Sequence, residues 1–248
     1  MTGTNSGATH SSTGDAVDNG GYFSFDGGDS IALESNPDLN LGGKSFSLMM
    51  FVKTSTSGEG FLWATDVSGS RGVGFKFQPS AGKFRISDEG TGQWTTSTTA
   101  ANNDAWALIG VTWDSSTKNS TIYFNGMHDG SEIESGAFSI STAITHLGKR
   151  AYGGAAGYYT GFMDEVGFWK DRVLTYGEVL ELYNNYNLGI RPTDAPIGPD
   201  NTAPLINLSI NNTSPKINEY INISFNVSDN IEISEVNMTT NGTLPSSA

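Results

Sequence analysis

Two neighbouring stretches decide the fold: Ala107-Leu-Ile-Gly-Val-Thr-Trp113 and Thr121-Ile-Tyr-Phe-Asn-Gly126. The first is almost continuously apolar, which is typical of a central strand buried on both faces. The second is a short apolar run that ends in Asn-Gly, the pair that most strongly favours a two-residue hairpin turn. The first stretch predicts a central strand of a β domain, and the second predicts a strand with one buried face that ends in a hairpin turn.

Strands of the same kind surround these two. Short apolar runs at Phe46–Val52, Val73–Phe77 and Lys83–Ile86 each suit a strand with one buried face, and Ala81-Gly82 is a weaker turn signal. Clusters of Gly, Asn, Asp and Ser separate the runs. Many short strands with regular turns predict an all-β, two-sheet antiparallel jelly-roll sandwich and not parallel α/β units.

One short helix is expected near the end of this domain. Thr175-Tyr-Gly-Glu178 matches the capping box, in which the Thr and Glu side chains accept hydrogen bonds from free N–H groups at a helix start. Val179, Leu180 and Tyr183 follow at helical spacing. The pattern predicts a C-terminal helix of about 10 residues that covers one end of the sandwich.

The chain divides into four parts. Residues 1–20 are small and polar, and we expect them to be flexible or to add one weak edge strand; residues 21–189 form the jelly roll. Residues 190–203 are a proline-containing linker. Residues 204–248 alternate apolar and polar positions and predict a second β unit. Because a complete immunoglobulin-like sandwich needs about 100 residues, this unit is expected to be partial.

The composition of the chain excludes several classes of binding partner. The formal net charge is −13, from 26 acidic and 13 basic residues, so the surface repels nucleic acid and anionic membranes. No apolar run approaches the roughly 20 residues that span a bilayer, so no membrane insertion is expected. Cysteine is absent, which excludes disulfides and thiolate metal sites. Without a signal segment at Met1, the chain is interpreted as a fragment of an exported protein or as a virion component.

Four segments, taken in order, resemble the laminin-G-like jelly roll of the concanavalin A-like superfamily. They are Tyr22–Ile31, Phe46–Lys53, Trp106–Trp113 with Tyr123–Gly126, and Gly161–Val166. Residues 204–248 are more weakly similar to an immunoglobulin-like repeat. The resemblance implies a domain that binds glycans or surface proteins on a cell surface, in an adhesin or in a virion, or that accompanies a carbohydrate-active enzyme.

The residues give no sign of catalysis. Glycosidases of the superfamily carry Glu-x-Asp-x-Glu, whereas Phe162-Met-Asp-Glu-Val166 has apolar residues at both glutamate positions. Asp164 and Glu165 are therefore interpreted as structural acceptors of backbone hydrogen bonds near the helix. The three histidines, His10, His128 and His146, are scattered and are interpreted as neither catalytic nor zinc-binding.

Calcium is a possible cofactor, with its ligands unassigned and the metal site unknown. The resemblance implies a calcium ion at the sandwich rim, held by Asp side chains and backbone carbonyls. Here the loop before Val73 reads Ser70-Arg-Gly, where relatives often place an aspartate, and Asp66 is the remaining carboxylate of that loop. Asp15–Gly20 superficially resembles an EF-hand loop, but Val17 stands at a ligand position.

Exposed aromatic side chains are the candidate ligand-binding residues. Trp94 lies in a polar stretch and is interpreted either as a sugar-stacking platform or as a plug at the sandwich edge. Tyr152 and Tyr158 lie in a loop rich in Gly and Tyr, a composition favoured in recognition loops. Tyr159 is assigned to the core. The other four tryptophans fall in strand patterns and are expected to be buried: Trp63, Trp106, Trp113 and Trp169.

Potential glycosylation triplets gather in the C-terminal part. Seven Asn-x-Ser/Thr acceptors lie between Asn207 and Asn241, against one, Asn119, in the sandwich. They indicate either a glycosylated stalk or an Asn-rich composition that generates the triplets by chance. The sequence thus predicts a non-catalytic extracellular recognition or adhesion module whose leading ligand is a glycan. The alternatives are a structural or protein–protein module of a surface filament or virion, and an accessory domain of a larger carbohydrate-active enzyme.

Overall fold

The structure is a computed structural model of the whole chain. It describes residues 3–12, 21–33, 39–67, 70–78, 81–88, 91–138, 144–150, 157–187, 205–210 and 223–228. The chain forms two compact units, Met1–Pro196 and Ile197–Ala248. No helix in these described segments is both long and apolar enough to cross a membrane.

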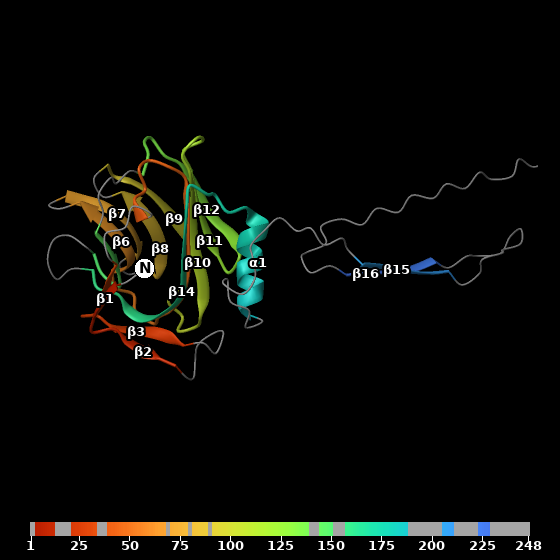
Figure 1. The fold of residues 1–248 in the computed structure, drawn as a ribbon, viewed down its shortest axis with the longest axis horizontal. Helices are drawn as coiled ribbons and strands as arrows, with labels where there is room; N and C mark the ends of the chain where they lie inside the picture. The colour runs from red at the N-terminus through yellow and green to blue at the C-terminus, as the bar shows by residue number, and fades with distance from the viewer. Residues whose placement is uncertain are drawn as a thin grey trace, which may run out of the picture. The chain divides into compact units, whose positions relative to one another are not determined.

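The first unit is a sandwich of two seven-stranded antiparallel sheets, as predicted (Figure 1). Sheet A has the order β1 (Gly3–Ser6), β4 (Ser30–Leu33), β13 (Ile144–Leu147), β6 (Gly60–Val67), β7 (Ser70–Phe77), β8 (Lys83–Asp88) and β9 (Gln93–Ala100). Sheet B has the order β12 (Met127–Ile133), β11 (Asn119–Phe124), β10 (Ala107–Asp114), β5 (Phe46–Lys53), β14 (Thr160–Lys170), β3 (Tyr22–Asp26) and β2 (Thr9–Ser11).

β10 is central in sheet B, as predicted, whereas β5, which was expected to have one buried face, is also central and is buried on both faces. β10 and β5 pair with Val111 opposite Leu48, and nearly every residue of both strands is buried. One face of the pair packs into the sandwich core with Trp113 and Trp63, each at most 1% exposed. The Asn125-Gly126 turn between β11 and β12 is confirmed: both residues have positive φ, 49° and 81°.

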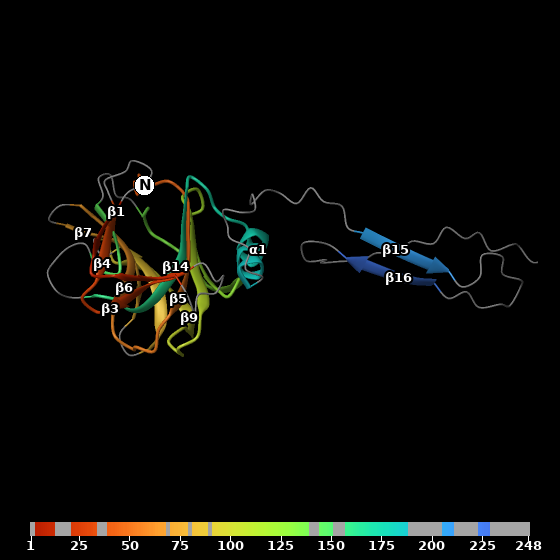
Figure 2. The ribbon, with the colours of Figure 1, turned by 60° about the horizontal axis from the view of Figure 1, so that its bottom comes forward.

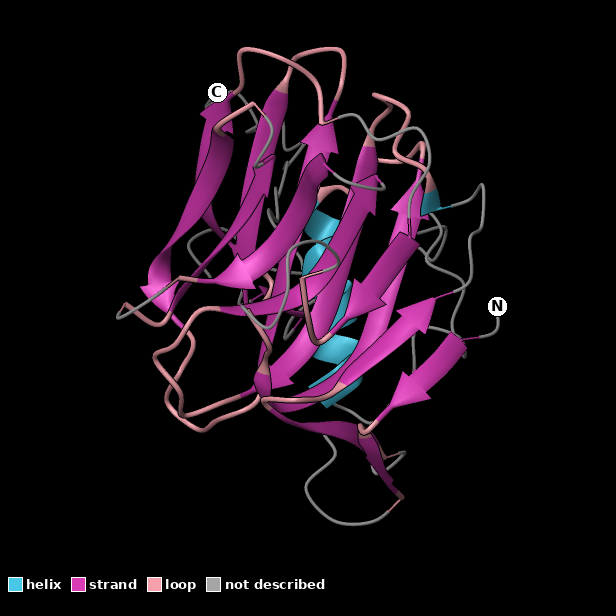
Figure 3. Ribbon diagram, turned by 90° about the vertical axis from the view of Figure 1, so that its left-hand side faces the viewer, coloured by secondary structure: helices cyan, strands magenta, loops and turns pink. Residues whose placement is uncertain are grey.

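Helix α1 (Tyr176–Asn187) packs on the outer face of sheet B, and Figures 1 and 2 show it beside that sheet from two directions. Its capping box is confirmed, because the Glu178 carboxylate accepts the Thr175 N–H at 2.8 Å and the Thr175 hydroxyl accepts the Glu178 N–H at 3.3 Å. Tyr186 stacks on Phe51 of β5 with ring centroids 3.5 Å apart. In Figure 3 the helix lies behind the strands, on the side away from sheet A.

Residues 1–20 were expected to be flexible or to add one weak edge strand, and the part that the structure describes adds two short edge strands. β1 pairs with β4 on sheet A, and β2 pairs with β3 on sheet B, so the segment gives each sheet an edge strand. The exposed Thr, Asn and Ser side chains of β1 contribute little packing. Backbone hydrogen bonds to a neighbouring strand hold these residues, and such pairing leaves no apolar pattern in the sequence.

The second unit contains the antiparallel pair β15 (Leu205–Ile210) and β16 (Ile223–Ser228). These are the two strands that the alternating sequence predicted. Their register places Asn207 directly opposite Asn226, so two of the potential glycosylation triplets are cross-strand neighbours. An immunoglobulin-like identity for this unit stays a prediction, and the linker at 190–203 lies outside the described residues.

Polar side chains join the two sheets along one side of the sandwich. Asp129 of β12 accepts hydrogen bonds from the Thr99 N–H and hydroxyl of β9 at 3.1 and 2.7 Å. Further along, the Thr95 hydroxyl donates to Glu134 at 3.0 Å, and the Gly136 N–H donates to Gln93 at 2.6 Å. This β9–β12 seam closes the sandwich on that side.

Candidate functional site

A polar pocket opens where β5 ends and β14 begins. Its volume is about 290 Å³, and its walls come from β3, β14 and the loops after β5 and before β10. The side chains that matter for ligand contact are those of Lys53, Thr54, Thr56, Asp104, Thr160 and Phe162. Hydroxyl, carboxylate and ammonium groups therefore meet an aromatic ring in one concave place, the composition expected of a small polar ligand site.

Backbone and hydroxyl contacts fix the shape of this pocket. The Thr54 hydroxyl donates to the Thr160 carbonyl at 2.7 Å and ties β5 to β14. The Asp104 N–H donates to the Thr54 carbonyl at 2.9 Å, although Asp104 has a left-handed backbone with φ 59°. Asp tolerates this conformation better than most residues. The contact holds the exposed Asp104 residue against the rim.

Three half-buried aromatic rings form a cluster that reaches the pocket through Phe162, and we call them the aromatic cluster: Tyr22, Trp106 and Phe162. Tyr22 meets Phe162 edge-on at 5.0 Å and Trp106 at 5.9 Å between centroids. The Lys53 ammonium lies 5.8 Å from the centroid of Phe162. Edge-to-face contacts stabilise the cluster, while part of its surface stays accessible for a ligand ring.

Sequence reasoning missed this pocket and assigned Trp106 to the core. The strand residues of the pocket come from β3, β5 and β14, which are far apart in the sequence, and they meet because β14 pairs with both β3 and β5. The signal available in the sequence was a bulky aromatic residue at each of three strand ends. The sequence alone does not give the strand register of the jelly roll, and without the register these residues cannot be recognised as neighbours.

Trp94 is exposed, as its polar neighbours predicted. It lies on β9 with 53% of its surface accessible, while Gln93 and Thr95 on either side point inward. The Arg85 guanidinium of β8 lies 5.7 Å from the centre of the indole ring. This exposure disfavours the edge-plug interpretation, because a plug would bury the ring. Its role in ligand binding stays a prediction.

The other two candidate residues do not join Trp94 in one site. Tyr152 lies outside the described residues. Tyr158 is half-buried next to the start of β6, where its carbonyl oxygen lies 3.3 Å from the position a Cβ would take on Gly60. β7 and β8 separate β6 from β9, a lateral distance of about 14 Å at the usual strand spacing. A monosaccharide cannot contact Trp94 and Tyr158 together.

The remaining aromatic assignments are largely confirmed. Tyr159 is buried, and its hydroxyl donates to the Phe162 carbonyl at 3.0 Å. Burial raises the pKa of this phenol well above its usual value. Trp63 and Trp113 are buried as expected. Trp106 and Trp169 are only half-buried, a correction for both, because they lie on the outer side of sheet B away from the sandwich core.

Asp164 has the structural contacts that the sequence suggested. One carboxylate oxygen accepts the Glu165 N–H at 2.9 Å, and the other accepts the Tyr186 hydroxyl of α1. Glu165 has φ 45° at a bulge of β14. The pair therefore shapes the strand and anchors the helix, and the two flanking positions of the motif are Phe162 and Val166.

Within the described segments no three His, Asp or Glu side chains gather in a way that could hold a metal ion. The three histidines lie on β2, β12 and β13. His146 is 9% exposed, and its Nδ1 is buried without a hydrogen-bond partner. Burial, with a smaller contribution from Lys149, lowers the pKa of His146 to about 4, so the imidazole is neutral at physiological pH. Calcium binding stays a prediction.

The two-sheet jelly roll, with a concave polar pocket and exposed aromatic rings, defines a lectin-like class of β-sandwich. Residues 25–180 match the family model described as the concanavalin A-like lectin/glucanases superfamily, and the chain belongs to this superfamily. No match was found among curated protein sequences.

Solved structures agree on the fold. A domain of an extracellular arabinanase from Geobacillus stearothermophilus, in complex with arabinotriose, aligns with TM-score 0.56 and 16% identity, over 73% of this chain and 87% of that one. A heptameric pentraxin from Limulus polyphemus aligns with TM-score 0.54 and 14% identity, over 68% and 83%. The binding domain of botulinum neurotoxin DC, in complex with SialylT, gives 0.50 and 13%, over 73% and 45%. At these identities the likeness establishes the fold alone.

Proposed function

We propose that this protein is a non-catalytic extracellular recognition module that binds carbohydrate in the polar pocket beside the aromatic cluster. The observation that carries the proposal is the meeting of Lys53, Asp104 and the threonine hydroxyls with the ring of Phe162 in one cavity. A pyranose has an apolar face and a rim of hydroxyl groups. It therefore needs an aromatic surface and convergent polar partners at the same place.

The pocket offers sugar hydroxyl groups both a positively and a negatively charged partner, Lys53 and Asp104. The Asp104 carboxylate accepts hydrogen bonds, and the Lys53 ammonium donates them. Hydrogen bonds to charged groups are stronger than those between neutral groups. Similar structures that contain arabinotriose and SialylT give further support for a saccharide as the ligand class. Trp94 and Arg85 lie on the other sheet, sheet A. We propose that Trp94 makes a second contact with a longer oligosaccharide.

The proposed extracellular location is supported by one of these similar structures, a domain of an extracellular enzyme. Two opposed glycosylation triplets on β15 and β16 are also consistent with an exported chain. The protein-binding and accessory-domain alternatives use the same fold, since one jelly roll hosts many functions.

The test is a glycan array probed with the full chain, with and without calcium, and with three single variants. Trp106→Ala removes one ring of the aromatic cluster, and we expect it to abolish selective binding. Trp94→Ala leaves that pocket intact and should weaken binding only to longer chains. Tyr176→Ala is the control, because Tyr176 is 43% exposed on α1 and away from both places.

The outcomes separate the proposals. Selective binding that is lost in Trp106→Ala and kept in Tyr176→Ala supports the pocket. Loss in Trp94→Ala alone would move the site to sheet A. If the folded chain binds no glycan, the carbohydrate proposal fails and a protein partner becomes the better hypothesis. A dependence on calcium would establish the cofactor.

A further inference from the structure

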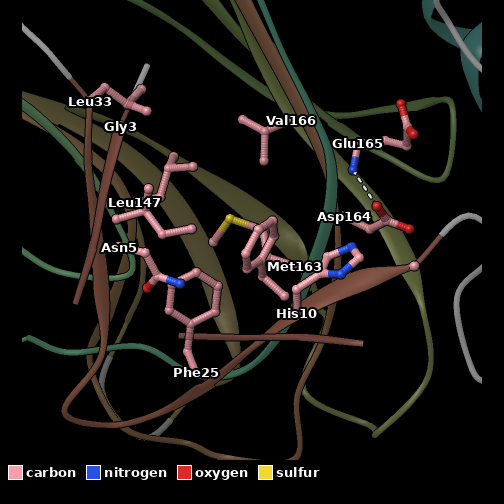
Figure 4. A pocket seen from close by; sticks show the side chains of 13 residues that line it. Gly3, Asn5, His10, Phe25, Leu33, Leu147, Met163, Asp164, Glu165 and Val166 are labelled. Atoms are coloured by element: carbon pink, nitrogen blue, oxygen red, sulfur yellow. Dashed lines mark hydrogen bonds between the residues drawn. The ribbon is translucent and has the colours of Figure 1, made fainter. Parts of the chain in front are cut away.

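The side of the sandwich opposite the β9–β12 seam contains an apolar cleft between the two sheets. A cavity of about 460 Å³ separates β4 and β13 of sheet A from β3 and β14 of sheet B. Figure 4 shows Leu33, Leu147, Met163 and Val166 around one shared space. A second cavity of about 320 Å³ adjoins Trp63 and Phe168. The volumes fall in the range of ligand sites.

The two cavities form one elongated cleft. Both are lined by Leu33, Leu147 and Val166, so they meet at these side chains. Along β14 the lining runs from Met163 in the first cavity to Lys170 in the second. The seven residue-to-residue steps from Met163 to Lys170 span about 23 Å at most, which is comparable to a long hydrocarbon chain.

The lining selects against polar occupants. Phe23, Ile31 and Leu147 are core side chains, yet they are only partly buried beside the cleft. A saccharide there would lose its hydrogen bonds to water without replacing them, and each lost bond costs about 1–3 kcal/mol. An inserted peptide strand would leave its N–H and C=O groups unpaired in the same way. A hydrocarbon chain has no such groups and gains from leaving water.

Four polar side chains line the first cavity, those of Asn5, His10, Asp164 and Glu165, and the Asp164 carboxylate already accepts the Glu165 N–H and the Tyr186 hydroxyl. His10 and Asn5 come from the edge strands β2 and β1, and the Asn5 amide donates to the Ala8 carbonyl at 2.6 Å. Figure 4 shows the Glu165 carboxylate directed away from the cavity. Val166, at the junction of the two cavities, keeps 38% of its surface accessible and marks an opening to solvent. A chain can therefore enter while its polar end group stays in water.

We propose that this cleft binds a single long hydrocarbon chain, such as the acyl chain of a lipid or fatty acid. The cleft and the polar pocket share only Phe25 of their lining, and Lys53 and Thr160 line the polar pocket alone, so the two are distinct sites. Apolar burial would supply the binding free energy at about 25 cal/mol per Å² of hydrocarbon surface.

The experiment titrates the full chain with cis-parinaric acid, kept below its micelle concentration and excited directly. We expect saturable fluorescence enhancement and displacement by unlabelled palmitate. Val166→Trp fills the junction of the cavities and should weaken binding about tenfold or more, equivalent to 1.4 kcal/mol or more. Val173→Trp is the matched control, because Val173 is also 38% exposed and does not line the cleft.

A second pair of variants covers the case in which tryptophan disturbs the fold. Val166→Asp places a charge at the opening without adding much volume, and it should weaken binding where Val173→Asp does not. The proposal is overturned if the folded chain gives no saturable signal. It is also overturned if both members of a pair lose binding equally, since the probe would then adsorb to the surface.

Discussion

The Tyr186 hydroxyl of α1 donates a hydrogen bond to the Asp164 carboxylate of β14, and the two residues lie 22 positions apart in the sequence. The same carboxylate accepts the N–H of Glu165, which has a positive φ at the strand bulge. Tyr186 therefore connects the helix to the irregular part of sheet B. Its ring also stacks on Phe51, so it contributes both a polar and an apolar contact.

Tyr186→Phe separates these two contributions. The variant keeps the stack on Phe51 and removes only the hydroxyl, which leaves one Asp164 oxygen without that donor. We expect the free energy of unfolding to fall by about 1.5–3 kcal/mol, as for other hydrogen bonds to charged groups. Urea denaturation measures this, with Tyr183→Phe as the control on a half-buried helix position. An equal effect of the two variants would contradict the role of the hydrogen bond.

Glu134 in the β9–β12 seam makes the sandwich less stable at neutral pH than it would be with a neutral side chain. Burial raises the pKa of this carboxyl above its ordinary 4.5, although the Thr95 hydrogen bond opposes the shift. Because the folded pKa is raised, the stabilisation from protonation is complete below pH 4.5 and is lost as the pH rises through the folded value.

Glu134→Gln keeps an acceptor for Thr95 and removes the buried charge. The variant should unfold about 2 °C higher than the native chain at pH 7. This increase in unfolding temperature should vanish below pH 4.5, where the native carboxyl is protonated. Thermal scans at the two pH values measure it. Glu132→Gln is the control, since Glu132 is exposed. A gain that persists at low pH would exclude the electrostatic explanation.

His146 should make the fold sensitive to moderate acid. Burial depresses the pKa of its imidazole from 6.5 to about 4. The unfolded chain therefore binds a proton more readily, and stability is progressively lost as the pH falls from 6.5 towards 4. His146→Gln should flatten this part of the stability profile, whereas His128→Gln, at an exposed position, should not. Denaturant midpoints measured across this pH range test the expectation. It is refuted if the native chain, His146→Gln and His128→Gln all lose stability with falling pH to the same extent.

Local signals predicted most of the sandwich. The Asn125-Gly126 turn and the Thr175–Glu178 cap depend on a few adjacent residues, and both are found as expected. A weak edge strand within residues 1–20 was one expectation, but β1 could not be located, because its stability comes from backbone pairing with β4, which no side-chain pattern records. Apolar alternation reports which face of a strand is buried, and a polar edge strand has no such face to report.

The candidate site was harder to predict than the fold. Trp94 could be recognised as exposed because its polar neighbours offer nothing to pack against. Trp106 resembles a core residue in the sequence, and only its contacts with Tyr22 and Phe162 across three strands reveal a half-exposed cluster. His146 has an ordinary strand context, so the burial that shifts its pKa follows from tertiary packing alone. Residues that meet through sheet pairing need the register before they can be assigned.

A substitution at Gly110 tests how closely β10 and β5 pack at the centre of sheet B. A Cβ on this glycine would lie 2.0 Å from the Met49 sulfur and 2.8 Å from the Leu48 carbonyl oxygen of β5. The methionine side chain can move, but the backbone oxygen belongs to a paired strand and cannot move freely. Gly110→Ala should therefore destabilise the fold by about 3 kcal/mol, at the upper end of the usual cost of overpacking a core.

Gly58→Ala is the matched control for this substitution. A Cβ there has no neighbour within 4 Å, and the backbone carries no strain that an alanine would meet. The control should leave the free energy of unfolding within about 0.5 kcal/mol of the native value or raise it slightly, because alanine restricts the unfolded chain more than glycine does. Urea denaturation of both variants gives the comparison. If Gly110→Ala is as stable as Gly58→Ala, β10 and β5 do not approach as closely as the register of Gly110 opposite Met49 requires.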